Sequence, residues 1–386
     1  MSRMNLASLK IRWLAVWVLG LTYAATETPA SPYSDLVVFG DSLSDLGNTS
    51  AATFGLQPGA GYFSGRFSNG PVYAEHLSTG LGLGTLARSG TGGTGYAYGG
   101  AETNGPDGFT GVFIKSLVEQ VDLFLNRVGS GADPAALYVV FIGANDLLGG
   151  QTNVNQPVGT VLAQMSRLVN AGARQFLGIN LPLLGLTPDY NTNATLAAAI
   201  SATTADYNAA LATAYDSLQA ATAGVIVHEL DLQSLFSQLV ATPAQWGFTN
   251  VTGRGQNVAS GLNAPGYIFW DGVHPTREAH ALLADAAIRA VLPTGDYNRD
   301  GVVTEADYFV WRDGYGTAFS ATLGQTSGLQ ADGNGDGRID VEDYTLWRDA
   351  LNSASRSVPE PTAWALASLL AMLGGTRSPR TARPIC

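Results

Sequence analysis

Apolar residues along this chain fall into short β-branched runs separated by longer stretches. The short runs predict strands that are covered on both faces, because such strands are apolar throughout. They occupy residues 35–39, 85–88, 137–142, 175–180 and 225–229. The longer stretches predict helices at residues 72–78, 114–128, 157–171, 195–221 and 277–291. Strand and helix in alternation indicate βαβ units. We therefore expect a three-layer α/β/α sandwich with a five-stranded parallel sheet, spanning residues 34–293.

Small and polar residues follow several of these runs. Ser42 comes directly after the first strand and Asn145 directly after the third. Gly100 closes a glycine-rich stretch after the second run, and Asp271 and His274 precede the last predicted helix. Ligands of α/β sheets bind beyond the carboxyl ends of the strands. We therefore expect these five residues to meet at one rim of the sheet.

Their chemistry suits acyl transfer. A serine hydroxyl is a poor nucleophile until a base takes its proton, and His274 can do so for Ser42. Asp271 can orient that imidazole and stabilise its charged form, and the order Ser–Asp–His along the chain is one of the known triad orders. The backbone N–H groups of Ser42 and Gly100 and the amide of Asn145 can bind a developing oxyanion.

These blocks closely resemble the GDSL/SGNH hydrolase family of esterases and lipases. The resemblance places its serine at Ser42, its oxyanion-hole residues at Gly100 and Asn145, and its Asp-x-x-His pair at Asp271 and His274. The second block reads Gly-Tyr-Ala-Tyr-Gly-Gly-Ala, with glycine where the family usually has asparagine, and residues 65–71 also match a segment common after the first block. The resemblance implies a flavodoxin-like five-stranded fold, an ester substrate (a lipid or an acylated glycan) and no catalytic metal.

Two alternatives stay open at this point. One is a carbohydrate O-acetylesterase of the same fold. The other is a non-catalytic surface protein that uses the fold for adhesion or binding. An intact set of Ser42, Asn145, Asp271 and His274 favours an enzyme, because a decayed enzyme is expected to lose at least one of them.

Charge is unevenly distributed. The net charge is −11, which argues against a nucleic-acid partner. Residues 295–352 contain eleven acidic and four basic side chains, so most of the excess negative charge lies there.

The single cysteine, Cys386, excludes a disulfide within the chain.

The acidic region contains two twelve-residue loops, 296–307 and 332–343. Each has oxygen-bearing side chains at positions 1, 3, 5, 9 and 12 and glycine at position 6, the pattern of an EF-hand calcium loop with aspartate in place of the usual glutamate at position 12. Hard oxygen ligands suit Ca²⁺. The candidate ligands are Asp296, Asn298, Asp300, Thr304 and Asp307 in the first loop, and Asp332, Asn334, Asp336, Asp340 and Asp343 in the second.

A similar helix signature follows each loop, so residues 295–352 contain an internal repeat. A duplicated loop–helix unit resembles the type I dockerin module. That resemblance implies two Ca²⁺ ions with a structural role and a cohesin-like partner. The alternative is a calcium-stabilised stalk that spaces the enzyme from a surface.

The two ends of the chain carry targeting patterns. Residues 1–25 are basic, then apolar, then small, which predicts a signal peptide; the apolar run is short for the alternative, a membrane anchor. Residues 358–386 contain Val-Pro-Glu-Pro, an apolar run and an arginine-rich end, and resemble a PEP-CTERM sorting signal. That resemblance implies processing by an exosortase-type enzyme. We expect export to the cell surface or extracellular matrix, with transient membrane tethering by residues 358–386. The alternative is that these residues are a disordered tail with a chance apolar patch.

Overall fold

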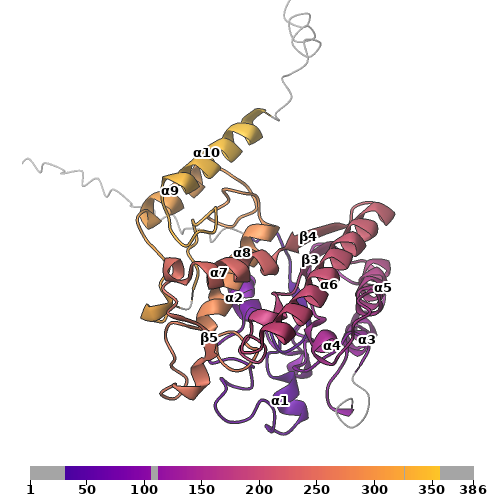
Figure 1. Ribbon diagram of the computed structural model, residues 1–386. Coiled ribbons are helices and arrows are strands. Elements are labelled where there is room, and N and C mark those ends of the chain that lie inside the picture. Colours follow the sequence, from indigo (N-terminus) through magenta and orange to yellow (C-terminus); the bar gives the residue numbers. More distant parts are fainter. Residues whose placement is uncertain (1–30, 106–111, 326, 357–386) are drawn as a thin grey trace, which may run out of the picture.

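The computed structural model describes residues 31–105, 112–325 and 327–356 (Figure 1). The predicted signal peptide and sorting signal lie outside these ranges. Within them, no helix combines the length and the apolar character needed to cross a membrane.

Four parallel strands form the central sheet, in the order β1-β2-β3-β4. Their bounds are Leu36–Gly40, Leu137–Phe141, Gln175–Ile179 and Ile226–Leu230. Every residue of β1 and β2 is buried, which explains why both read as unbroken apolar runs. The predicted parallel α/β fold is therefore confirmed, and each of the four predicted strands lies within one residue of its observed bounds.

The prediction of a fifth strand at residues 85–88 is wrong. Residues 85–88 form no strand, and Arg88 makes only an isolated bridge to Gly95. The free edge of β1 is instead covered by residues 94–98: the Val38 N–H donates to the Thr94 carbonyl at 3.0 Å, and the Tyr96 N–H donates to the Val38 carbonyl at 2.7 Å. Glycine explains the difference, because a Cβ on Gly93 would lie 2.1 Å from the carbonyl oxygen of Ala87. Closely spaced glycines allow this fold-back but weaken a regular ladder.

Helices cover both faces of the sheet (Figure 1). On one face α2 (Tyr73–Gly80) packs against α8 (Arg277–Val291). On the other face lie α3 (Leu117–Val128), α5 (Asn155–Ala171) and α6 (Ala194–Ala221). The three layers agree with the expected architecture. Ser116 caps α3 by accepting from the Glu119 N–H, while the Glu119 carboxylate accepts from the Ser116 N–H.

Several short elements were not predicted. Most of them connect the main elements near the carboxyl edge of the sheet, where loops build sites. The helices are α1 (Asn48–Ala52), α4 (Ala144–Leu148) and α7 (Leu232–Ala241), and β5 (Asn250–Arg254) pairs with β6 (Tyr267–Phe269) in a small parallel sheet. Single 3₁₀ turns occur at Ser89–Thr91, Leu184–Leu186, Pro243–Trp246, Gly255–Asn257 and Ala321–Leu323.

The acidic appendage contributes α9 (Glu305–Gly314) and α10 (Val341–Arg356), each directly after one of the two acidic loops. The two loop–helix repeats are joined by hydrogen bonds from their tryptophan side chains. The Trp311 indole N–H donates to the Asp340 carbonyl at 2.7 Å, and the Trp347 indole N–H donates to the Thr304 carbonyl at 2.8 Å. The tryptophan of each repeat therefore fixes the acidic loop of the other.

Candidate active site

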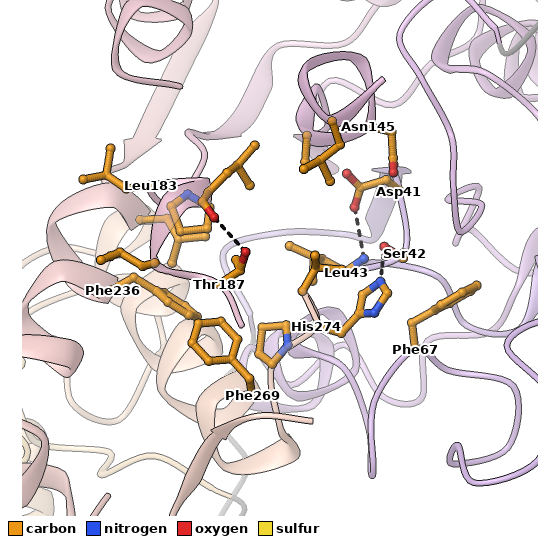
Figure 2. Close-up of a pocket in the computed structure, with 18 of the residues that line it drawn as sticks. Asp41, Ser42, Leu43, Phe67, Asn145, Leu183, Thr187, Phe236, Phe269 and His274 are labelled. Atoms are coloured by element: carbon orange, nitrogen blue, oxygen red, sulfur yellow. Dashed lines mark hydrogen bonds between the residues drawn. The ribbon is translucent and has the colours of Figure 1, made fainter. Parts of the chain in front are cut away.

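Ser42, His274 and Asp271 form one continuous hydrogen-bonded chain. Figure 2 shows the link between Ser42 and His274. His274 Nε2 lies 2.8 Å from Ser42 Oγ, and His274 Nδ1 lies 2.7 Å from Asp271 Oδ2. Ser42 follows β1, whereas the other two residues lie between β6 and α8. This geometry allows the imidazole to take the serine proton while the carboxylate holds the ring.

The Asp271 carboxylate is held from two directions. Its Oδ1 accepts the backbone N–H groups of Val273 at 2.9 Å and His274 at 2.8 Å. Its Oδ2 accepts from the Tyr62 hydroxyl at 2.7 Å as well as facing His274. Burial raises the pKa of Asp271, but the hydrogen bond to His274, its charge and the other donors outweigh burial and hold the pKa well below its usual range. Asp271 therefore stays ionised near neutral pH.

Three candidate oxyanion donors belong to residues that line the pocket beside Ser42. Gly100 and Asn145 line the same pocket as Ser42, and Gly100 has a left-handed φ of +82° that favours glycine. Among the residues that the structure describes, no acceptor pairs with the backbone N–H of Ser42 or of Gly100. The Asn145 amide donates one hydrogen to the Ala101 carbonyl at 2.9 Å, which fixes its orientation and leaves its second hydrogen for a ligand.

Asp45 joins the serine turn to the glycine-rich segment. Its buried carboxylate accepts the backbone N–H groups of Gly47 at 2.8 Å, Asn48 at 2.7 Å and Thr49 at 3.1 Å. It also accepts the Gly99 N–H at 2.9 Å, so that N–H is engaged, whereas the next residue, Gly100, lines the pocket. Asp45 was not predicted as a site residue, although it lies only three residues after Ser42.

The pocket beside Ser42 is mainly apolar. It encloses about 930 Å³ including its open mouth. Leu183, Phe236 and Phe269 lie at the side of the pocket away from Ser42 and Asn145 (Figure 2). Its other apolar lining comes from segments far apart in the chain: Leu43, Phe67, Leu148, Leu184, Leu186, Leu232 and Leu283. Such a wall suits a hydrocarbon chain attached to a group at Ser42.

Asp41 also lines this pocket and is almost fully buried. Its Oδ1 accepts from the Leu43 N–H at 3.0 Å, while its Oδ2 has no partner within the described part of the chain. Burial raises the pKa of Asp41 to about 6. The site therefore contains a carboxyl group that changes charge within the ordinary working range of an enzyme.

The candidate calcium ligands lie in two loops with closely matching hydrogen bonds. In the first loop Asp296 Oδ2 accepts the Gly301 N–H at 2.8 Å, and in the second Asp332 Oδ2 accepts the Gly337 N–H at 2.9 Å. Within the described residues, no group of three or more His, Cys, Asp or Glu side chains is arranged so that it could hold a metal ion. The carboxylates are instead turned toward the N–H groups of their own loops.

A family model of GDSL-like lipases and acylhydrolases matches residues 36–287, and the chain belongs to this family. It is 31% identical to phosphatidylcholine-sterol acyltransferase of Aeromonas hydrophila over 333 residues, which covers 72% of this chain and 96% of that protein. It is also 31% identical to esterase EstA of Pseudomonas aeruginosa, over 70% of this chain but only 49% of that longer protein. A GDSL esterase/lipase of Arabidopsis thaliana is 26% identical over 93% of its length. These relationships identify the chain as an enzyme that hydrolyses ester bonds.

Proposed function

We propose that this chain is an exported serine ester hydrolase that cleaves carboxylic esters through an acyl-enzyme on Ser42. The observation that carries the proposal is the unbroken hydrogen-bonded chain from Ser42 through His274 to Asp271. It lies at the end of an apolar pocket, beside three N–H groups suited to an oxyanion.

In the proposed reaction, Ser42 Oγ attacks the ester carbonyl and its proton passes to His274 Nε2. The oxyanion is bound by the N–H groups of Ser42, Gly100 and Asn145. The intermediate then expels the alcohol, which takes the proton from His274, and the acyl group stays on Ser42. Water then attacks the carbonyl carbon of the acyl group while His274 takes one of its protons. The bond from that carbon to Ser42 Oγ breaks, the free acid leaves, and the proton passes from His274 to Ser42 Oγ.

The pocket favours an ester whose acyl chain is longer than acetyl. The apolar lining continues to Leu183, Phe236 and Phe269, on the side of the pocket away from Ser42. A longer acyl chain can bury apolar area there at roughly 25 cal/mol per Å². This supports a lipid-like ester over the alternative, a carbohydrate O-acetylesterase. Two of the relatives, an esterase and a phosphatidylcholine-sterol acyltransferase by name, are compatible with such a substrate.

The test compares wild type with Ser42→Ala on p-nitrophenyl acetate, butyrate and decanoate. We expect the wild type to prefer the longer chains and Ser42→Ala to lose all measurable hydrolysis. A fluorophosphonate probe should label the wild type but not the variant. The control is Ser217→Ala, which removes a hydroxyl from the surface of α6. Full activity in Ser42→Ala would exclude the acyl-enzyme proposal.

We propose further that the two acidic loops bind two Ca²⁺ ions in a structural role. Asp296, Asp307, Asp332 and Asp343 are buried carboxylates, and buried charges are ordinarily paired or bound to metal. Burial is the largest cause that raises the pKa of Asp296 to about 6 and that of Asp332 to about 7, and nearby aspartates add to it against the opposing hydrogen bonds and Arg289. A bound cation would relieve both effects. Binding requires the carboxylates to turn toward a common centre while they keep their loop contacts.

Calorimetric titration of the full chain with CaCl₂ tests this proposal. We expect two sites and a Tm that falls when a chelator is added. Asp343→Ala should lose at least one site, whereas Asp349→Ala, in an exposed pair with Arg348, should bind calcium like wild type. No heat of binding and an unchanged Tm would exclude a structural calcium ion.

The role of the appendage and the cellular location are proposals as well. Contacts from both acidic loops to α8 support an appendage fixed to the hydrolase body over a free stalk. A cohesin-like partner would then bind its outer face, where Phe309 and Tyr315 are exposed. Co-purification with a cohesin domain tests this. Export, with removal of both ends, is supported by the sequence patterns alone and is tested by the mass and location of the mature chain.

A further inference from the structure

Tyr62 contacts the candidate triad from a loop that contributes no residue to the proposed reaction. Its hydroxyl oxygen lies 2.7 Å from Asp271 Oδ2, the same oxygen that faces His274 Nδ1. Tyr62 stands 209 positions before Asp271 in the chain, so only tertiary structure brings the two together.

The direction of this hydrogen bond follows from its partners. Asp271 is ionised and can only accept, so Tyr62 must donate. Burial, and then the Asp271 carboxylate, raise the pKa of Tyr62 well above its usual value, so Tyr62 stays a neutral donor throughout the working range.

The loop that carries Tyr62 is attached to the Asp271–His274 turn at further points. The Ser68 hydroxyl donates to the Pro275 carbonyl at 2.8 Å, and Asn69 Oδ1 accepts the Arg277 N–H at 2.8 Å. The Phe67 ring packs on the His274 imidazole with centroids 5.2 Å apart. Phe67, Ser68 and Asn69 belong to the segment 65–71, which matches a segment common in the family after its first block. That segment therefore holds the loop in register with the turn.

We propose that Tyr62 is a positioning residue of the ester hydrolase, acting on His274 through Asp271. The inference rests on the proposed triad. With both Oδ1 contacts made by backbone N–H groups, the Tyr62 hydroxyl completes the set of donors that fixes the carboxylate plane. It also withdraws charge from Oδ2, so the carboxylate stabilises the charged imidazole less than it otherwise would.

Other charged groups surround this arrangement. Asp41, directly after β1, and His280 of α8 both interact electrostatically with His274. Beyond Tyr62, Arg254 of β5 pairs with Asp189, whose backbone N–H donates to the Gly272 carbonyl at 3.0 Å. None of these groups changes in Tyr62→Phe, which removes one hydroxyl and keeps the ring.

The test is Tyr62→Phe in the full chain. We expect kcat to fall about 10-fold, the value of one hydrogen bond to a charged group, with KM within twofold. We also expect the acidic limb of the kcat/KM profile to move upward by roughly 0.3 pH unit or more, because the carboxylate then holds the imidazolium more strongly. The control is Tyr33→Phe, which removes a buried 2.7 Å hydrogen bond to the Val291 carbonyl far from the site.

A double-mutant cycle separates positioning from general loosening. In an Asp271→Asn background, Tyr62→Phe should cause no further loss, because its effect passes through the missing carboxylate. An unmoved acidic limb, or an equal loss in both backgrounds, would overturn the inference. If Ser42→Ala abolishes hydrolysis in the same assays, such a result leaves the proposed function intact. Activity in Ser42→Ala would instead defeat the proposed function itself.

Discussion

Asp285 of α8 accepts a hydrogen bond from Arg299 of the first acidic loop, with Oδ1 and Nη2 3.2 Å apart. Its other carboxylate oxygen accepts from Arg289 of the same helix at 2.7 Å, and Arg289 also donates to the Asp332 carbonyl of the second loop at 3.3 Å. Asp285 is only 5% exposed. One buried carboxylate therefore links the hydrolase body to both acidic loops.

This link contributes more to orientation than to net stability. Burial raises the pKa of Asp285 and lowers that of Arg299 in spite of their pairing. The cost of removing both charges from water therefore outweighs their attraction, as is common for buried ion pairs.

Breaking the link from one side should nevertheless be costly. Asp285→Ala leaves two guanidinium groups near each other without their partner, so we expect the free energy of unfolding to fall by about 3–5 kcal/mol. Urea unfolding measures this. Asp313→Ala removes the partner of Arg312 in an exposed pair on α9 and should cost less than about 1 kcal/mol. Equal effects of the two substitutions would show that Asp285 is not a structural link.

Leu183 is expected to limit the length of the acyl chain. Leu183→Trp adds bulk to the side of the pocket away from Ser42. Hydrolysis of p-nitrophenyl decanoate should therefore fall about 10-fold or more relative to hydrolysis of the acetate. This factor corresponds to roughly one or two methylene groups that the pocket no longer buries. The ratio of kcat/KM for the two esters measures it. Leu196→Trp, on the exposed surface of α6, should leave the ratio unchanged. An equal fall in kcat/KM for both esters would mean that the acyl chain of the substrate does not contact Leu183.

Asn145→Ala tests the oxyanion hole. Loss of one side-chain donor should lower kcat roughly 10²–10³-fold and change KM little, because the contact forms mainly in the transition state. The variant should unfold at nearly the same urea concentration as wild type, since only one bond to the Ala101 carbonyl is lost. Asn153→Ala, an exposed change before α5, is the control. A rise in KM with unchanged kcat would place Asn145 in substrate binding instead.

Asp41 should make stability depend on pH. Burial raises its pKa to about 6 in the folded chain, from an ordinary value near 3.8. The folded protein therefore binds the proton more tightly than the unfolded chain, and the stabilisation present below pH 4 is lost as pH rises through 6. Asp41→Asn keeps an acceptor for the Leu43 N–H and does not ionise. The increase in unfolding free energy of this variant over wild type should be about 2 kcal/mol larger at pH 8 than at pH 4. The same change at both pH values would contradict this.

The sequence by itself determined most of the α/β body. β1 and β2 are buried on both faces, so their residues are apolar without interruption, and such runs are visible with no knowledge of neighbours. The helix at 277–291 was predicted with its observed bounds. Ser42, Asn145, Asp271 and His274 could be proposed as one site because residues that end parallel strands or enter the final helix meet at one rim.

Tertiary structure decided everything that depends on one segment meeting another. Residues 85–88 have strand-like composition, yet a strand needs a partner, and the glycine-rich segment 94–98 occupies the edge of β1 instead. Tyr62 reaches Asp271, and Arg299 reaches Asp285, through loops whose local sequence contains no sign of their targets. The pocket wall is assembled from distant segments, including Leu183 and Phe236. Local pattern reports burial and periodicity along one segment, whereas these contacts depend on the packing of the whole chain.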